Sequence, residues 1–217
     1  MKNSFFSLIV TVYNLEEYLS ACLDSILAQT FNDYEILLVN NNSSDNSGKI
    51  CEYYAKRDNR IRYFALDGNS VMGAAHRCGL AHAFGDYIWF IDGDDLLPKN
   101  ACEKVAVKLS ETKSDVIFGG FSTFLDGEVA NFIDTPYDPR NINKRSKDEA
   151  LRYLVEKQQP VLATWRLIYS RDLYNRVLSH ERFTKLTRDA HQDTAFGVMT
   201  LVSADAICYI NDVIYNY

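Results

Sequence analysis

Acidic side chains cluster directly after an apolar segment of this chain. The segment YIWFI, residues 87–91, leads into Asp92, Asp94 and Asp95, and no lysine or arginine lies nearer than Lys99. Like charges this close repel one another, so a positive charge from outside the chain would stabilise them. Carboxylate oxygens suit a hard divalent cation, whereas a turn rich in Asp and Gly is the simpler alternative. The cluster alone leaves both interpretations open.

The composition is that of a globular protein and excludes two classes of partner. The chain has 217 residues, of which 47% are hydrophobic and 24% charged, enough for one domain with a substantial core. The formal net charge of -6 argues against nucleic acid, because a protein that binds the phosphate backbone normally carries a basic face. No apolar run approaches the roughly 18 residues of a membrane span, and the short apolar segment at the start predicts a strand rather than a signal peptide.

The cysteines indicate reduced thiols. There are five, widely spaced and without a CxxC pair, which favours a cytoplasmic protein without a disulfide framework or a zinc site. Cys22 and Cys102 fall on apolar stripes of predicted helices, where we expect them to be buried.

Strands and helices alternate along the first half of the chain. Apolar runs predict strands at 5–14, 34–40, 61–66 and 87–91, and helical spacing predicts helices at 15–29, 49–58, 71–84 and 100–113. Because the strands are apolar on both faces, the pattern predicts an α/β fold with a mostly parallel central sheet flanked by helices. Asn14 and Glu17 are predicted to form a capping box at the start of the first helix.

Ligands of such sheets bind where the strands end. The polar loop 40–46 and the cluster 92–95 each follow a predicted strand, so we expect them to share one cleft. Beyond Asp95 the pattern weakens: we expect a strand at 115–125, an irregular stretch at 126–146, a helix at 147–158, a strand at 162–169 and a helix at 193–202.

Several segments together, in their order and spacing, resemble the family 2 glycosyltransferases. The nucleotide-binding half of that family is matched by SLIVTVYNLEEYLSACLDSILAQTFNDYEILLVNNNSSDNS, CEYYAKRDNRIRYF and GDYIWFIDGDD, and its acceptor half by HQDTAFGVMTLVSADAICYINDVIYNY. The resemblance implies a single GT-A domain over 1–217, with a Rossmann-like nucleotide-sugar-binding half at about 1–125 and an acceptor-binding half at about 126–217. It leaves open whether the acceptor half is truncated at the carboxyl end.

The resemblance also implies an activity. It points to an inverting, metal-dependent glycosyltransferase that moves a sugar from a nucleoside diphosphate sugar, expected to be a UDP-sugar, to a hydroxyl of a glycan or lipid-linked glycan acceptor. The expected role is the synthesis of bacterial capsule, lipopolysaccharide or another surface polysaccharide. The expected location is the cytoplasm, with at most peripheral association at the inner face of the membrane.

The family's chemistry maps onto three carboxylates of this chain. Asp92-Gly93-Asp94 matches the DxD motif, in which Asp94 would coordinate Mn²⁺ or Mg²⁺ on the diphosphate and Asp92 would lie near the ribose and the metal. The general base would be Asp193, the second member of a Gln192-Asp193 pair where the family usually has Glu-Asp. Helix capping is the alternative role for Asp193.

The resemblance assigns the remaining nucleotide-binding roles to Val12, Asn14, Asn41 and His76. Asn41 stands where members usually have an Asp that hydrogen-bonds the base, and an amide can still donate and accept. His76 stands where many members have an Arg near the phosphates, and an ordinary helix histidine is its alternative. Asp45 matches a later acid of the same loop or simply caps a helix, and His191 is a candidate because it neighbours the proposed base.

The sequence argues against three other functions. A non-catalytic nucleotide-sugar-binding module would explain the departures at Asn41, Ser70-Val71 and His76 as decay, but the retained Asp193 argues against it. A sugar-1-phosphate nucleotidyltransferase needs a glycine-rich basic loop where this chain reads TVYNLEEYL. A dehydrogenase needs GxGxxG after the first strand, which is absent.

Overall fold

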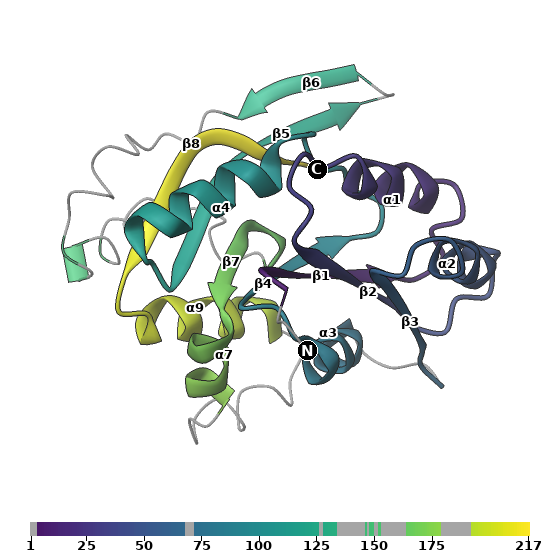
Figure 1. Cartoon of the computed structure of the whole chain (residues 1–217), viewed down its shortest axis with the longest axis horizontal. Helices are drawn as coiled ribbons and strands as arrows, with labels where there is room; N and C mark the ends of the chain where they lie inside the picture. Colours follow the sequence, from purple (N-terminus) through teal and green to yellow (C-terminus); the bar gives the residue numbers. More distant parts are fainter. Residues whose placement is uncertain are drawn as a thin grey trace.

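The computed structural model of the chain describes residues 4–67, 72–125, 128–133, 164–178 and 192–217, together with residues 146, 148, 149 and 152 (Figure 1). An eight-stranded sheet runs through it in the order β3-β2-β1-β4-β7-β5-β6, with β8 beside β5. The strands are β1 (Phe6–Val12), β2 (Tyr34–Asn40), β3 (Ile61–Ala65), β4 (Tyr87–Asp92), β5 (Val116–Leu125), β6 (Glu128–Ile133), β7 (Leu167–Ser170) and β8 (Ile207–Asn216).

The helices cover both faces of this sheet. They are α1 (Leu19–Leu27), α2 (Ser47–Ala55), α3 (Met72–His82), α4 (Ala101–Thr112), α7 (Arg171–Leu178) and α9 (Gln192–Ser203), with a 3-10 turn η1 (Thr164–Arg166). In Figure 1, α1, α2 and α4 lie on one side of the strands and α3, α7 and α9 on the other. In the described ranges, no helix is long and apolar enough to cross a bilayer.

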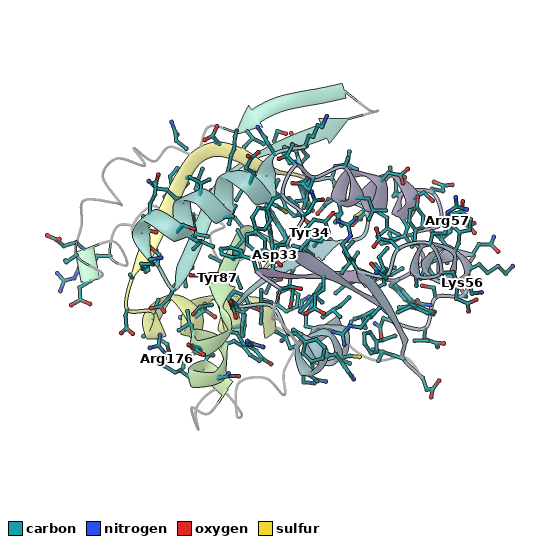
Figure 2. The ribbon with its side chains drawn as sticks, in the orientation of Figure 1. Asp33, Tyr34, Lys56, Arg57, Tyr87 and Arg176 are labelled. Carbon is teal, nitrogen blue, oxygen red and sulfur yellow. The ribbon has the colours of Figure 1, made fainter. Side chains whose placement is uncertain are left out.

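The two faces of β1 explain this layering. Alternate residues of a strand point to opposite faces, so Phe6, Leu8 and Val10 pack in one buried cluster with α1 and α4. Ile9 packs in a second cluster with side chains of α3, α7 and α9. Charged side chains lie outside both clusters: Figure 2 shows Lys56 and Arg57 at the outer end of α2 and Arg176 on α7, all at the periphery.

The sheet is parallel in its first half and mixed in its second. β1 pairs in parallel with β2 and β4, and β2 with β3. β7 is antiparallel to both β4 and β5, β6 is antiparallel to β5, and β8 is parallel to β5. The predicted α/β class with a mostly parallel central sheet is therefore confirmed, and the antiparallel pairs are those that β6 and β7 make.

Most expected elements are present, and the differences are local. The first helix begins at Leu19 rather than at residue 15, and the capping box of Asn14 and Glu17 is wrong because the helix has no side-chain cap. Within the predicted strand 162–169, residues 164–166 form the turn η1 and a strand starts at Leu167, and the helix α7 that follows was not predicted. The stretch expected to be irregular contains β6, whereas most of the expected helix 147–158 lies outside the described residues.

The cysteines match their expected state. All five are free, and Cys22 and Cys102 are buried on the helices where the apolar stripes placed them. Burial raises the pKa of the Cys102 thiol to about 12, so this side chain acts as a small apolar core residue rather than as a nucleophile.

Candidate functional site

Three strand ends lie together at one edge of the sheet. The register pairs Val12 with Asn40 and Thr11 with Asp92, so β1, β2 and β4 stop at the same level. The loops that follow them contain the polar segment after Asn40 and the acidic cluster after β4. The two segments expected to share one cleft thus lie at the same edge of the sheet, and the cleft itself stays a prediction.

The β1 and β2 loops are held together by side chain to backbone hydrogen bonds. Asn14 Oδ1 accepts from the backbone N–H of Ser44 at 2.8 Å, and the N–H of Asn14 donates to Ser43 Oγ at 3.0 Å. The N–H of Leu15 donates to Ser47 Oγ at 2.8 Å. Asn14 has a φ of 53°, a left-handed conformation that asparagine tolerates better than most residues. Its amide therefore serves the loop contact rather than the start of α1.

Acidic residues complete this contact between the loops. Asp45 accepts hydrogen bonds from the N–H groups of Glu16 and Ser47 at 3.0 and 2.9 Å, and Glu16 accepts from the N–H of Asn46 at 2.9 Å. Burial acts to raise the pKa of the Asp45 carboxyl, but the hydrogen bonds from Ser47 and Glu16 outweigh this effect and lower that pKa. Asp45 precedes the N-cap residue Asn46, and α2 has no side-chain cap hydrogen bond. Asp45 therefore stabilises the start of α2 from outside the cap position, through its hydrogen bond from the N–H of Ser47. The loop roles of Ser43, Ser47 and Glu16 were not predicted.

Val12 and Asn41 meet at the junction of these loops. The backbone N–H of Asn41 donates to the carbonyl oxygen of Val12 at 2.8 Å, and Asn41 is half-buried. The side chain of Val12 is buried in the core, so any contribution of Val12 to nucleotide binding must come from its backbone.

The end of β4 lies against β1. The hydroxyl of Thr11 donates to Asp92 Oδ1 at 3.2 Å, and the N–H of Gly93 donates to the Thr11 carbonyl oxygen at 3.1 Å. A Cβ at Gly93 would lie 2.9 Å from that carbonyl oxygen and 3.0 Å from Leu15 Cδ1. Glycine therefore allows the turn to approach β1, while Asp92 is half-buried and Asp94 is exposed.

Gly93→Ala is expected to destabilise the fold by about 1–3 kcal/mol, as overpacking at a close backbone contact does. Thermal unfolding monitored by circular dichroism measures this effect. Gly48→Ala is the control, because a Cβ there meets only the ends of the Asn40 and Tyr63 side chains, at 3.1 and 3.4 Å. Equal melting temperatures for the Gly93 variant and the wild type would contradict the packing role of Gly93.

Asp95 is the buried member of the acidic cluster. The Asp95 carboxylate accepts a hydrogen bond from Tyr215 Oη at 2.6 Å. The tyrosine oxygen in turn accepts from the N–H of Asp92 at 3.0 Å. Burial raises the pKa of the Asp95 carboxyl to about 7; the Tyr215 hydrogen bond opposes this shift, and the charges of Asp92 and Asp94 add to it. Burial and then the charges of the three aspartates raise the pKa of the Cys22 thiol well above its usual range. The negative field of the cluster therefore reaches into the core.

The carboxylates fit a divalent cation that arrives with a substrate. Asp94 is exposed at the strand end, and within the described ranges no lysine or arginine forms an ion pair with Asp94 or Asp95. The same residues contain no group of three or more His, Cys, Asp or Glu side chains placed to hold a metal. Mg²⁺ is usually held by one or two carboxylates plus substrate phosphates, not by a cage of protein ligands. Asp92 and Asp94 match that donor set.

The other expected site residues are placed only in part. His76 is 8% exposed on α3, and its ring lies 4.2 Å from that of Phe90 between centroids. This contact favours its packing alternative, and its phosphate-binding role stays a prediction. Asp193 is the second residue of α9, close to the predicted helix start. Its side chain, like all of His191, lies outside the described part of the chain.

Comparison with known proteins identifies the family. The model of "Glycosyl transferase family 2" matches residues 7–178. The uncharacterized glycosyltransferase EpsJ of Bacillus subtilis is 31% identical over 97% of this chain and 60% of its own length. The minor teichoic acid biosynthesis protein GgaB of the same organism is 28% identical over 94% of this chain and 20% of its own length. The chain thus spans only part of these longer relatives.

Solved structures share the fold. Residues 1–349 of Staphylococcus aureus TarS in complex with UDP superpose with a TM-score of 0.76 at 23% identity, covering 98% of this chain and 60% of that one. The mannosyltransferase PcManGT of Pyrobaculum calidifontis, in complex with GDP-Man and Mn²⁺, superposes with a TM-score of 0.68 at 18% identity, covering 100% of this chain and 57% of that one. These superpositions show the shared fold, and the family match over residues 7–178 shows that the chain belongs to glycosyl transferase family 2.

Proposed function

We propose that this domain is an inverting, metal-dependent glycosyltransferase that takes its sugar from a UDP-sugar. The observation that carries the proposal is the exposed Asp94 at the end of β4, at the same sheet edge as the loop of Asn41. At that edge, the carboxylates of Asp92 and Asp94 would bind the metal of a metal–diphosphate, and the Asn41 amide would hydrogen-bond the base. The UDP complex of TarS and the Mn²⁺ complex of PcManGT, which have the same fold, support the assignment.

The chain's own residues supply the remaining steps of the proposed reaction. Asp94 and Asp92 would hold Mn²⁺ or Mg²⁺, which as a Lewis acid stabilises the leaving diphosphate. Asp193 would accept the proton of the acceptor hydroxyl while the hydroxyl oxygen bonds to the anomeric carbon. The bond from that carbon to the diphosphate oxygen breaks, UDP leaves with the electron pair, and the single displacement inverts the anomeric configuration.

We infer a glycan or lipid-linked glycan as acceptor. The support is that GgaB is named for teichoic acid biosynthesis, a process that builds a surface polymer. We infer that the enzyme takes part in the synthesis of a surface polysaccharide. It would act at the cytoplasmic side of the membrane, with at most peripheral attachment of the protein, as a nucleotide-sugar donor requires.

A panel of UDP- and GDP-sugars tests this function. Each sugar nucleotide is incubated with the protein in Mn²⁺, in Mg²⁺ and in EDTA, and the release of the free nucleotide is measured. We expect metal-dependent release from a UDP-sugar. Full turnover in EDTA would overturn metal dependence, and turnover only with GDP-sugars would overturn the donor class.

The second candidate function is a non-catalytic nucleotide-sugar-binding module. It is favoured by Asn41, which replaces the usual Asp of the base-reading loop. Such a module would bind UDP with metal, as the enzyme does, and would transfer nothing to any acceptor. Binding alone cannot separate the two, whereas removal of the proposed base does.

Asn41→Asp is expected to increase the preference for UDP over GDP. The wild type should bind UDP more tightly than GDP but with modest discrimination, because the neutral amide offers no charged acceptor to the N–H of uracil. Calorimetric titration of both nucleotides into both proteins, in excess Mn²⁺, measures the ratio. Tighter binding of GDP by the wild type, or an unchanged ratio in the variant, would contradict a base-reading role for Asn41.

A further inference from the structure

One tyrosine of the carboxy-terminal strand β8 hydrogen-bonds both the end of β4 and the acidic turn that follows it. Tyr215 Oη accepts from the N–H of Asp92 at 3.0 Å and donates to Asp95 Oδ2 at 2.6 Å. A phenol hydroxyl has one proton to donate and can accept as well, so the two contacts use complementary capacities of one group. Tyr215 lies on β8, which pairs with β5 and not with β4. The hydroxyl therefore links β8 directly to Asp92 at the end of β4, beside the backbone bridge between Leu96 and Asn216.

The Tyr215 hydroxyl binds β4 on the side away from β1, at a level where β7 no longer pairs with it. β7 pairs with β4 only from Tyr87 to Trp89. The N–H of Gly93 points toward β1, where it donates to Thr11. Because successive peptide groups of a strand point to opposite sides, the N–H of Asp92 points away from β1, beyond the end of the β7 pairing. A buried N–H without a partner is costly, and the Tyr215 hydroxyl takes the place of the next strand.

Tyr215 is itself held firmly. It is 1% exposed, and its ring stacks on Trp165 with a centroid distance of 4.6 Å and an interplanar angle of 23°. The next residue, Asn216, exchanges two backbone hydrogen bonds with Leu96, at 3.0 and 2.9 Å, and its side-chain oxygen accepts from Ser122 Oγ at 2.7 Å. The end of β8 and the turn after β4 thus form one hydrogen-bonded unit.

We propose that Tyr215 is a positioning residue for the metal-binding turn, and that Asp95 is the anchor through which it acts rather than a metal ligand. This inference rests on the proposed function. Asp94 is exposed. Before it in the sequence, Asp92 donates its N–H to the Tyr215 hydroxyl, and after it, the Asp95 carboxylate accepts from that hydroxyl. The backbone that directs the Asp94 carboxylate is therefore fixed before a metal–diphosphate binds. Removal of a group that orients a metal's ligands in this way typically costs about 10–100-fold in metal affinity or activity.

Tyr215→Phe tests the proposal, because it removes the hydroxyl and keeps the ring on Trp165. We expect the Mn²⁺ concentration that half-saturates UDP binding, measured by calorimetry, to rise by about 10-fold or more. Tyr54→Phe is the matched control: Tyr54 Oη donates to Asp24 Oδ1 at 2.7 Å between α2 and α1, away from β4. It should lower the melting temperature without moving the Mn²⁺ requirement. A wild-type Mn²⁺ requirement in Tyr215→Phe would overturn the positioning role.

Substitutions of Asp95 separate anchoring from charge. Asp95→Asn keeps an oxygen that accepts from Tyr215, whereas Asp95→Ala removes it, and both remove the same charge. We expect the alanine variant to need several-fold more Mn²⁺ than the asparagine variant. Equal requirements would mean that Asp95 acts through its charge alone and would refute the anchor. Wild-type protein that binds UDP without any Mn²⁺ dependence would instead refute the proposed function.

Discussion

Replacing Asp94 by alanine is expected to abolish metal-dependent sugar transfer while the fold is retained. Asp94 is exposed at the end of β4, so its truncation opens no cavity in the core. It is also the carboxylate of the DxD match that would coordinate the metal on the diphosphate. Without it, the negative charge that develops on the leaving group lacks its main stabilisation, and such electrostatic contributions are among the largest in catalysis. Release of UDP from the donor, followed with time in saturating Mn²⁺, measures the loss.

The stability of the Asp94 variant provides an internal check. In EDTA, its melting temperature should equal or slightly exceed that of the wild type, because removal of one of three neighbouring like charges relieves repulsion. Asp172→Ala is a suitable control, because Asp172 is an exposed carboxylate on α7, on the opposite face of the sheet from α1 and α4. It should transfer sugar like the wild type. Transfer by Asp94→Ala within a few-fold of the wild type would remove this carboxylate from the metal site.

The sequence predicts the meeting of the ends of β1, β2 and β4 for a physical reason. Strands that are apolar on both faces and alternate with helices must form a covered parallel sheet, and in such a sheet the strand ends meet at one edge. The placement of Asp92 beside Thr11, and of Asn41 beside Val12, follows from that rule. Local periodicity is sufficient because the burial of each strand on both faces is visible in its own residues.

What the sequence does not reveal depends on contacts between distant segments. Asn14 has the residue type of a helix cap, but its side chain bonds Ser44, and no local pattern records that choice. Tyr215 bonds a turn more than a hundred residues away; in the sequence it is one more aromatic residue of an apolar strand. Asp95 is visible as a charge, but its burial and its partner are not. These roles are set by tertiary packing, which a reading of one segment at a time does not contain.

The start of α9 shows where a correct local prediction still leaves function open. The helix was expected at 193–202 and is found at Gln192–Ser203, so the backbone at Asp193 is as predicted. A helix start explains an aspartate equally well without catalysis. An acidic residue in the first turn stabilises a helix by about 0.3–1 kcal/mol through the helix dipole. The two roles of Asp193 therefore differ in what its replacement by asparagine changes.

Asp193→Asn is expected to reduce sugar transfer by about 10²-fold or more, the usual contribution of a positioned general base. The amide keeps the size and most hydrogen bonds of the carboxylate but has no basic site for the acceptor proton. Because the donor and metal are bound by other residues, the affinity for UDP in Mn²⁺ should stay almost unchanged, and calorimetry checks that the site is intact. A carboxylate is a weak base in water, so its effect depends on being held close to the attacking hydroxyl.

If Asp193 only stabilises the first turn of α9, the variant should melt slightly lower, bind UDP normally and transfer sugar within a few-fold of the wild type. That last outcome, with an acceptor that the wild type uses, would exclude Asp193 as the base. A wild type that binds UDP with metal but transfers sugar to no glycan or lipid-linked glycan acceptor would favour the non-catalytic module.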